Sequence, residues 1–291
     1  MQAPVTTLNA VALAMSALLL LAHSMNCRAA RAGADAAKAD TALVLAVDVS
    51  DSVDAERYRL QMEGIARALE DPAVVDAITS GPRGGIVLSL LAWSDDAEVV
   101  MPWETIRSGE QARRVANIIR TLPQRGGDYT CVARMLVRVH DILLPTAAPG
   151  ADRIVIDVSG DGIDNCEVRK ASDAARDAIV AKGATINGLP IIVEGENDIV
   201  GVGTFRRPGF AFEDLGLDRD ATTLDAWYRD HVIGGAGRFL HVANGYEDFG
   251  RAFRHKFVTE ISGQALPTPV AGHFSGESRF PLLPPPAAPR K

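Results

Sequence analysis

Apolar runs alternate with helix-like segments from residue 41 to residue 263. A strand that is buried on both faces has a continuous apolar run, whereas a surface helix repeats its apolar residues every three or four positions. The strand pattern occurs at 41–49, 85–93, 153–158 and 185–193. The helical pattern occurs from Asp54 onward, at 110–122, 132–144, 168–181 and 224–232, and from Tyr246 onward. This alternation predicts an α/β fold, with a doubly wound, mostly parallel sheet and helices on both of its faces.

Several shorter signals complete this prediction. Residues 97–106 are expected to form a strand that pairs beside 85–93, and residues 238–242 a further strand. Pro123 and Pro145 are expected to end the helices that precede them, and Gly183 to cap the helix at 168–181. Phe249, Phe253 and Phe257 recur every four residues, which predicts a core-facing stripe on the last helix.

Two segments break the alternation. Residues 194–222 are rich in Gly, Asp and Glu without periodicity, which predicts an inserted loop. This insert contains Phe205, Arg206, Arg207 and Phe210, a candidate second recognition surface. From residue 264 the chain is Pro-rich, which predicts a disordered tail at 264–291. The alternating strand and helix patterns between these ends of the chain predict a single domain at 41–263.

The N-terminus predicts export. Residues 10–22 form an apolar run that is shorter than the roughly 20 residues needed for a membrane span. Small residues suited to signal-peptidase cleavage follow, either Ala30-Arg31-Ala32 or Ala22-His23-Ser24. We therefore expect a signal peptide at 1–32, a linker at 33–40, a periplasmic or secreted bacterial protein, and no membrane span after cleavage. The alternative is a buried core helix, because no Lys or Arg precedes the apolar run.

Composition narrows the class of protein. The chain is 47% hydrophobic and 23% charged, with a formal net charge of −7, as in ordinary globular proteins. No basic patch stands out, which argues against nucleic acid as a partner. Cys27 lies near the predicted cleavage region, leaving Cys131 and Cys166 as an even pair in an oxidising compartment. We expect these two to form a disulfide; the alternative is a pair of buried free thiols.

Three loops carry the candidate chemistry. Asp48-Val-Ser50-Asp-Ser52 follows the first predicted strand, residues 159–162 (SGDG) follow the strand at 153–158, and residues 126–130 (GGDYT) precede a predicted helix. Ligands of open α/β sheets bind beyond the carboxyl ends of the strands. Carboxylates and hydroxyls without a Cys or His cluster suit Mg²⁺, Mn²⁺ or Ca²⁺ rather than zinc. Alternatively, Ser52 or Asp51 is simply the N-cap of the following helix.

Together these motifs resemble the metal-ion-dependent adhesion site of von Willebrand factor A (VWA) domains. The resemblance implies five metal ligands, which are Asp48, Ser50, Ser52, Thr130 and Asp161. Thr130 is assigned because residues 130–136 (TCVARML) resemble the family's T-x-[IV]-[GA]-x-A-L helix start. Asp161 is preferred to Asp157 because it lies past the strand and before a glycine. Residues 186–191 (INGLPI) and 227–239 (WYRDHVIGGAGRF) resemble a bacterial exported branch of VWA-like proteins of unknown function.

The resemblance implies a binding module rather than an enzyme. A bound divalent cation, Mg²⁺ by preference, would capture an acidic residue of a partner protein. One alternative is a metal-dependent, phosphatase-like hydrolase with Asp48 as nucleophile, although Ser50 stands where such enzymes carry a second Asp. The histidines are interpreted as structural or solvated, and residues 159–162 do not form a G-x-S-x-G elbow. The other alternative is a VWA scaffold without metal.

Overall fold

The computed structural model describes residues 38–147, 150–167, 170–201 and 221–262. The strands are β1 (Thr41–Asp48), β2 (Ile86–Trp93), β3 (Ala97–Ile106), β4 (Arg153–Gly160), β5 (Thr185–Ile192), β6 (Ile199–Val200), β7 (Thr222–Thr223) and β8 (Ala243–Asn244). The α-helices are α2 (Ala55–Glu70), α3 (Pro72–Thr79), α4 (Gly109–Arg120), α5 (Val132–Arg138), α6 (Leu144–Thr146), α7 (Ala171–Val180), α8 (Leu224–His231) and α9 (Phe249–Ser262). A π-helical turn, η1 (Val139–Leu143), joins α5 to α6.

One twisted sheet forms the centre of the fold. Its strand order is β3-β2-β1-β4-β5-β8. All neighbouring strands are parallel except β2 and β3, which form an antiparallel pair. Every residue of β1 and β2 is buried, as their continuous apolar sequences require. The predicted doubly wound α/β fold is therefore confirmed.

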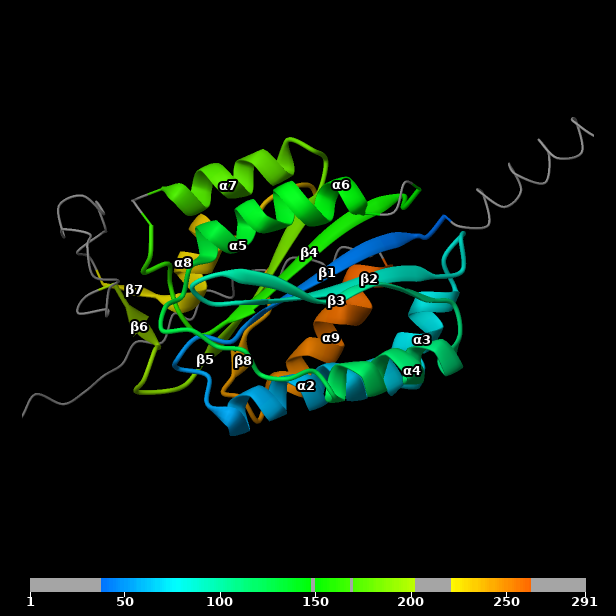
Figure 1. Ribbon diagram of the computed structural model, residues 1–291, viewed down its shortest axis with the longest axis horizontal. Helices are drawn as coiled ribbons and strands as arrows, with labels where there is room; N and C mark the ends of the chain where they lie inside the picture. Colours follow the sequence, from blue (N-terminus) through cyan, green and yellow to red (C-terminus); the bar gives the residue numbers. More distant parts are fainter. Residues whose placement is uncertain (1–37, 148–149, 168–169, 202–220, 263–291) are drawn as a thin grey trace, which may run out of the picture.

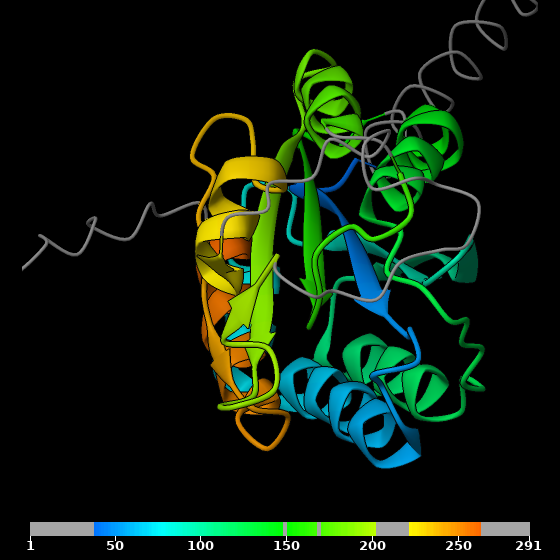
Figure 2. The ribbon, with the colours of Figure 1, turned by 90° about the vertical axis from the view of Figure 1, so that its left-hand side faces the viewer.

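Helices cover both faces of this sheet (Figures 1 and 2). On one face, α2, α3, α4 and α9 pack over the larger apolar core. On the other, α5, α7 and α8 pack over a second core. The predicted stripe of Phe249, Phe253 and Phe257 is confirmed, because all three rings are buried and stack along α9.

Several predicted boundaries were wrong. The helix expected to stop before Pro145 continues to Thr146. The π-helical turn η1 precedes α6, and Pro145 lies in the first turn of α6. Proline is tolerated there because the backbone N–H groups of a first turn have no partner within the helix. The strand expected at 238–242 is instead the two-residue β8, and only Leu240 forms an isolated bridge in the predicted range. The sequence pattern did not predict the break between α2 and α3. Asp71 is the C-cap of α2 and the N-cap of α3.

The insert is partly structured. Its two ends form β6 and β7, which pair with each other, whereas 202–220, with the candidate surface at 205–210, lies outside the described residues. The predicted signal peptide, most of the linker and the Pro-rich tail also lie outside them. No helix within the described ranges is long and apolar enough to cross a membrane.

Candidate metal centre

The candidate ligands lie where the winding of the sheet reverses. From β1 the chain passes to β2 on one side, and β4 lies against β1 on the other. The register of β1 and β4 pairs Val47 with Ser159, so Asp48 and Asp161 emerge at the same edge. Ligands of open α/β sheets bind at such a reversal point, since the two loops diverge there and leave a crevice.

Hydrogen bonds connect the first loop to Asp161. Asp48 Oδ1 accepts from the Ser50 backbone N–H at 2.8 Å, which holds the loop against the strand end. The hydroxyls of Ser50 and Ser52 lie 3.2 Å apart. Ser52 Oγ donates to Asp161 Oδ1 at 2.7 Å. The helix that follows is capped by Asp54, whose carboxylate accepts from Arg57 N–H, so the interpretation of Ser52 or Asp51 as its N-cap is wrong.

Thr130 completes the group from the third loop. Its Oγ1 donates to Ser50 Oγ at 3.4 Å, and a parallel bridge between Ser50 and Gly127 carries the loop past the end of β1. The five oxygen-bearing side chains predicted from the sequence therefore lie together. Four of them are buried, while Ser52 is exposed at the mouth.

One carboxylate oxygen lacks a protein partner. Asp48 Oδ2 is buried and accepts no hydrogen bond, and the nearby Tyr228 hydroxyl is also without a partner. A Cβ added to Gly160 would come within 2.8 Å of Asp48 Oδ2 and 2.7 Å of the Tyr228 hydroxyl, so only glycine leaves this space open. Buried polar atoms nearly always have partners. An unpartnered carboxylate oxygen among hydroxyls fits a hard cation, so these residues meet the requirements of a divalent metal.

The electrostatics point the same way. Burial, and after it the charge of Asp161, raise the pKa of Asp48 to about 8. Burial also raises the pKa of Asp161, although hydrogen bonds from Ser52 and Tyr246 oppose the shift. Two carboxylates that resist ionisation together would be stabilised in their charged forms by a bound cation.

Four residues around Asp161 were not predicted from the sequence. Tyr246 Oη donates to Asp161 Oδ2 at 2.8 Å, and Asn197 Nδ2 donates to the Asp161 carbonyl at 2.7 Å. The Arg57 guanidinium lies 5.1 Å from the centre of the Tyr246 ring and 4.0 Å from Asp161 Oδ2, and Glu196 holds it through two hydrogen bonds. These residues come from α2, the start of the insert and the segment before α9, and no shared motif connects them.

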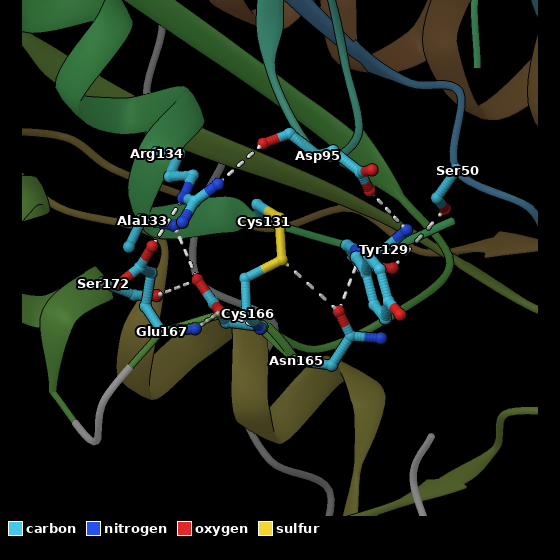
Figure 3. The surroundings of a disulfide bond; sticks show 12 residues. Ser50, Asp95, Tyr129, Cys131, Ala133, Arg134, Asn165, Cys166, Glu167 and Ser172 are labelled. Carbon is cyan, nitrogen blue, oxygen red and sulfur yellow. Dashed lines mark hydrogen bonds and ion pairs between the residues drawn. A yellow bond between two sulfur atoms is a disulfide. The ribbon is translucent and has the colours of Figure 1, made fainter. Parts of the chain in front are cut away.

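A disulfide joins the two loops that flank the centre (Figure 3). Cys131 and Cys166 are bonded, with their Cα atoms 5.1 Å apart. Beside them, Asn165 Oδ1 accepts from Thr130 N–H at 2.8 Å, and Asn165 N–H donates to the Thr130 carbonyl at 3.1 Å. The predicted disulfide is therefore present in the structure, and it holds the Thr130 loop against the loop that carries Asp161.

Asp164 organises the same region. Its carboxylate accepts from the backbone N–H groups of Ala133, Cys166 and Glu167 and from the Ser172 hydroxyl. The bond to Ala133 caps the start of α5, where Cys131 offers no side-chain cap. Burial raises the pKa of Asp164 in spite of these bonds. The sequence offered one clue to this role, because Asp164 lies in the same loop as Asp161.

The described histidines contact other parts of the molecule. His140 pairs with Asp141, His231 pairs with Asp173, and the rings of His241 and His255 lie 5.1 Å apart. Within the described ranges, no group of three or more His, Cys, Asp or Glu residues could hold a metal. Any metal here would thus depend on the hydroxyls as well as on the two carboxylates.

Residues 38–265 match one family, described as "Protein of unknown function (DUF1194)". The chain belongs to this family. A search of curated proteins finds no similar sequence.

Solved structures similar to this DUF1194 protein include VWA proteins. The von Willebrand factor type A protein from Catenulispora acidiphila is 16% identical, with a TM-score of 0.48, over 77% of this chain and 43% of that one. Proximal thread matrix protein 1 from the mussel byssus, "with zinc occupied MIDAS motif", is 14% identical, with a TM-score of 0.49, over 77% and 48%. The conserved hypothetical protein BatB from Bacteroides thetaiotaomicron is 13% identical, with a TM-score of 0.46, over 77% and 100%. The chain thus spans less than half of the first two proteins.

Proposed function

We propose that this protein is an exported binding module that holds a divalent cation between Asp48 and Asp161. The observation that carries the proposal is the buried Asp48 Oδ2, which lacks a protein partner beside a space that only Gly160 leaves open. Ser50, Ser52 and Thr130 would supply the remaining protein oxygens. An all-oxygen set favours Mg²⁺, with Mn²⁺ and Ca²⁺ as alternatives.

The proposed ligand is an acidic residue of a partner protein. The bound cation would supply a coordination position for one oxygen of that carboxylate. Ser52 is exposed, and Arg57 lies at the same edge with 23% of its side chain exposed. The Arg57 guanidinium is already paired with Glu196, so the proposed preference for an acidic partner rests on the cation.

Two features support export. The apolar run at 10–22 and the small residues after it have the pattern of a signal peptide. The disulfide between Cys131 and Cys166 is of the kind that persists in oxidising compartments. Expression of the full chain in a bacterium, followed by fractionation and N-terminal sequencing, tests this part of the proposal. A cytoplasmic protein with an intact N-terminus would contradict it.

Titration calorimetry with Mg²⁺, Mn²⁺ and Ca²⁺ tests the metal site. We expect saturable binding by the wild-type protein and binding at least roughly tenfold weaker in Asp48→Asn, which removes a charge and preserves the shape. The matched control is Asp51→Asn, because Asp51 carries the same charge in the same loop but is exposed. Equal binding by the wild type and Asp48→Asn, or no binding at all, would contradict the proposal and favour a scaffold without metal.

Acetate tests the open coordination position. With Mn²⁺ bound, a carboxylate that displaces a metal-bound water lowers the relaxation rate of solvent protons, whereas acetamide at the same concentration should not. We expect this difference in the wild type and in Asp51→Asn. A parallel assay with phosphoesters and Mg²⁺ or Mn²⁺ tests the hydrolase alternative, because turnover that is lost in Asp48→Asn would identify an enzyme.

A further inference from the structure

A second group of charged side chains is buried on the α9 face of the sheet. Lys256 of α9 is 0% exposed, Asp157 of β4 is 2% exposed and Glu260 of α9 is 3% exposed. Two carboxylates thus share one ammonium group in the interior. Burial of three charges costs several kcal/mol per ion unless their geometry satisfies all of them. Asp157 lies in the middle of β4, four residues before Asp161, and none of the three residues belongs to the candidate metal centre.

The contacts among the three residues are close but incomplete. Lys256 Nζ lies 2.6 Å from Asp157 Oδ1 and also contacts Glu260 Oε1, one helical turn further along α9. Asp157 nevertheless accepts no hydrogen bond at either oxygen, so the approach of Nζ lacks hydrogen-bond geometry. Glu260 Oε1 accepts from Asn187 Nδ2 at 2.8 Å, while Glu260 Oε2 has no partner. In a conventional buried salt bridge, the carboxylate oxygens of Asp157 and Glu260 would all accept hydrogen bonds.

An aromatic ring also lies near the amine. The ring of Phe239 lies 5.5 Å from Lys256 Nζ. Burial, and after it the charge of Asp157, raise the pKa of Glu260 to about 7. A carboxyl group with such a pKa can exchange a proton near neutral pH, as general acid–base groups do.

We propose that Lys256 and Asp157 become joined by an intramolecular isopeptide bond, with Glu260 as the group that transfers the protons. The amine lies 2.6 Å from Oδ1 of the carboxyl group that it would attack, so the reaction needs no encounter step. The product would tie the last helix covalently to a central strand.

The step balances without any co-reactant. Glu260 relays one proton from the Lys256 ammonium to Asp157, so that a neutral amine lies beside a neutral carboxyl group. The Nζ lone pair then attacks Cγ of Asp157. A C–N bond forms, and one C–O bond of Asp157 breaks. Glu260 takes a second proton from the nitrogen and gives it to the leaving hydroxyl group, which departs as water. An ammonium and a carboxylate become a neutral amide, so two buried charges disappear.

Mass spectrometry of the full chain, purified and reduced, tests the proposal directly. We expect the protein to be lighter, by the mass of one water molecule, than the mass calculated for the sequence from its measured N-terminus onward. After trypsin digestion, peptide 154–169 should be linked to peptide 255–279, because trypsin does not cut after a lysine whose amine is an amide. Lys182 is the internal control, since it is exposed and should be cut normally. The full sequence mass together with cleavage after Lys256 would overturn the proposal.

Three variants test the roles. Glu260→Gln keeps nucleophile and carbonyl but removes the proton carrier, so we expect the full mass and restored cleavage after Lys256. Asp157→Ala should have the same effect. Glu247→Gln is the matched control, because Glu247 is an exposed glutamate just before α9, and it should keep the linked peptide. A folded Glu260→Gln protein that still contains the linked peptide would overturn the role of Glu260. The wild-type measurement decides on the bond even if a variant fails to fold.

Discussion

The hydroxyl of Tyr246 donates a 2.8 Å hydrogen bond to Asp161 Oδ2, across 85 positions of the chain. The other oxygen of the same carboxylate accepts from Ser52, so Asp161 is held from two sides. The buried Tyr246 ring also lies beneath the guanidinium of Arg57. The segment before α9 therefore positions a candidate metal ligand that lies after β4.

Tyr246→Phe should weaken the metal centre. The variant removes one hydrogen bond to a buried carboxylate, so we expect the free energy of unfolding to fall by about 1–2 kcal/mol. Loss of this positioning bond should also raise the metal dissociation constant roughly tenfold. Tyr58→Phe is the matched control, because the Tyr58 hydroxyl donates to the Leu122 carbonyl, outside the site. It should lose stability without a change in metal affinity, whereas an unchanged affinity in Tyr246→Phe would contradict the prediction.

Gly160→Ala should block the centre sterically. The new methyl group would lie within 2.8 Å of Asp48 Oδ2, where van der Waals contact requires more room. We expect calorimetry to show no saturable metal binding, and overpacking to cost about 1–3 kcal/mol of stability. Gly109→Ala is the comparison, because its methyl group would meet neighbours only at 3.5 Å or beyond. Normal metal binding by Gly160→Ala would show that the space beside Asp48 is not the cation site.

Loss of the disulfide should affect both stability and binding. The bond closes a loop of 35 residues, which by the chain-entropy relation stabilises the fold by about 3–4 kcal/mol. Urea unfolding of a Cys131→Ala, Cys166→Ala double variant should show a loss of this size. Metal affinity should also fall, because Cys131 adjoins Thr130. Cys27→Ala should change neither quantity. Full metal affinity in a folded double variant would mean that the hydrogen bonds of Asn165 suffice to hold the loop.

The buried Glu260 predicts a dependence of stability on pH. Its pKa is raised from 4.5 to about 7, so between these values the folded protein binds more protons than the unfolded chain. The free energy of unfolding must therefore fall as the pH rises through this window, by on the order of 2–3 kcal/mol. Asp48 acts in the same direction, so the test compares the wild type with Glu260→Gln in a metal chelator. Burial is the first cause of the Glu260 shift, and a covalent bond present only in the wild type would offset the two stability curves without changing their slopes, so the slopes are compared. The difference between them should grow from pH 5 to pH 8, and parallel curves would refute the prediction.

Much of the fold could be predicted because its signals are local. The apolar runs at β1 and β4 and the phenylalanine repeat on α9 need no knowledge of distant residues. The polar residues at the ends of these strands could be grouped for a related reason, because parallel strands place their carboxyl ends at one edge. Boundaries such as that of β8 were missed, since a strand of two residues is defined by its neighbour rather than by its own sequence.

The sequence by itself determined the class of fold and the oxygen-rich loops that form the candidate metal centre, and it favoured the pairing of the two cysteines that the structure contains. Only the tertiary structure decided which groups support Asp161 and which oxygen of Asp48 lacks a partner. It also brought Lys256 to Asp157, which no motif connects. The reason is physical: periodicity and loop chemistry act over a few residues, whereas burial and the partners of a buried charge depend on packing between elements far apart in the chain.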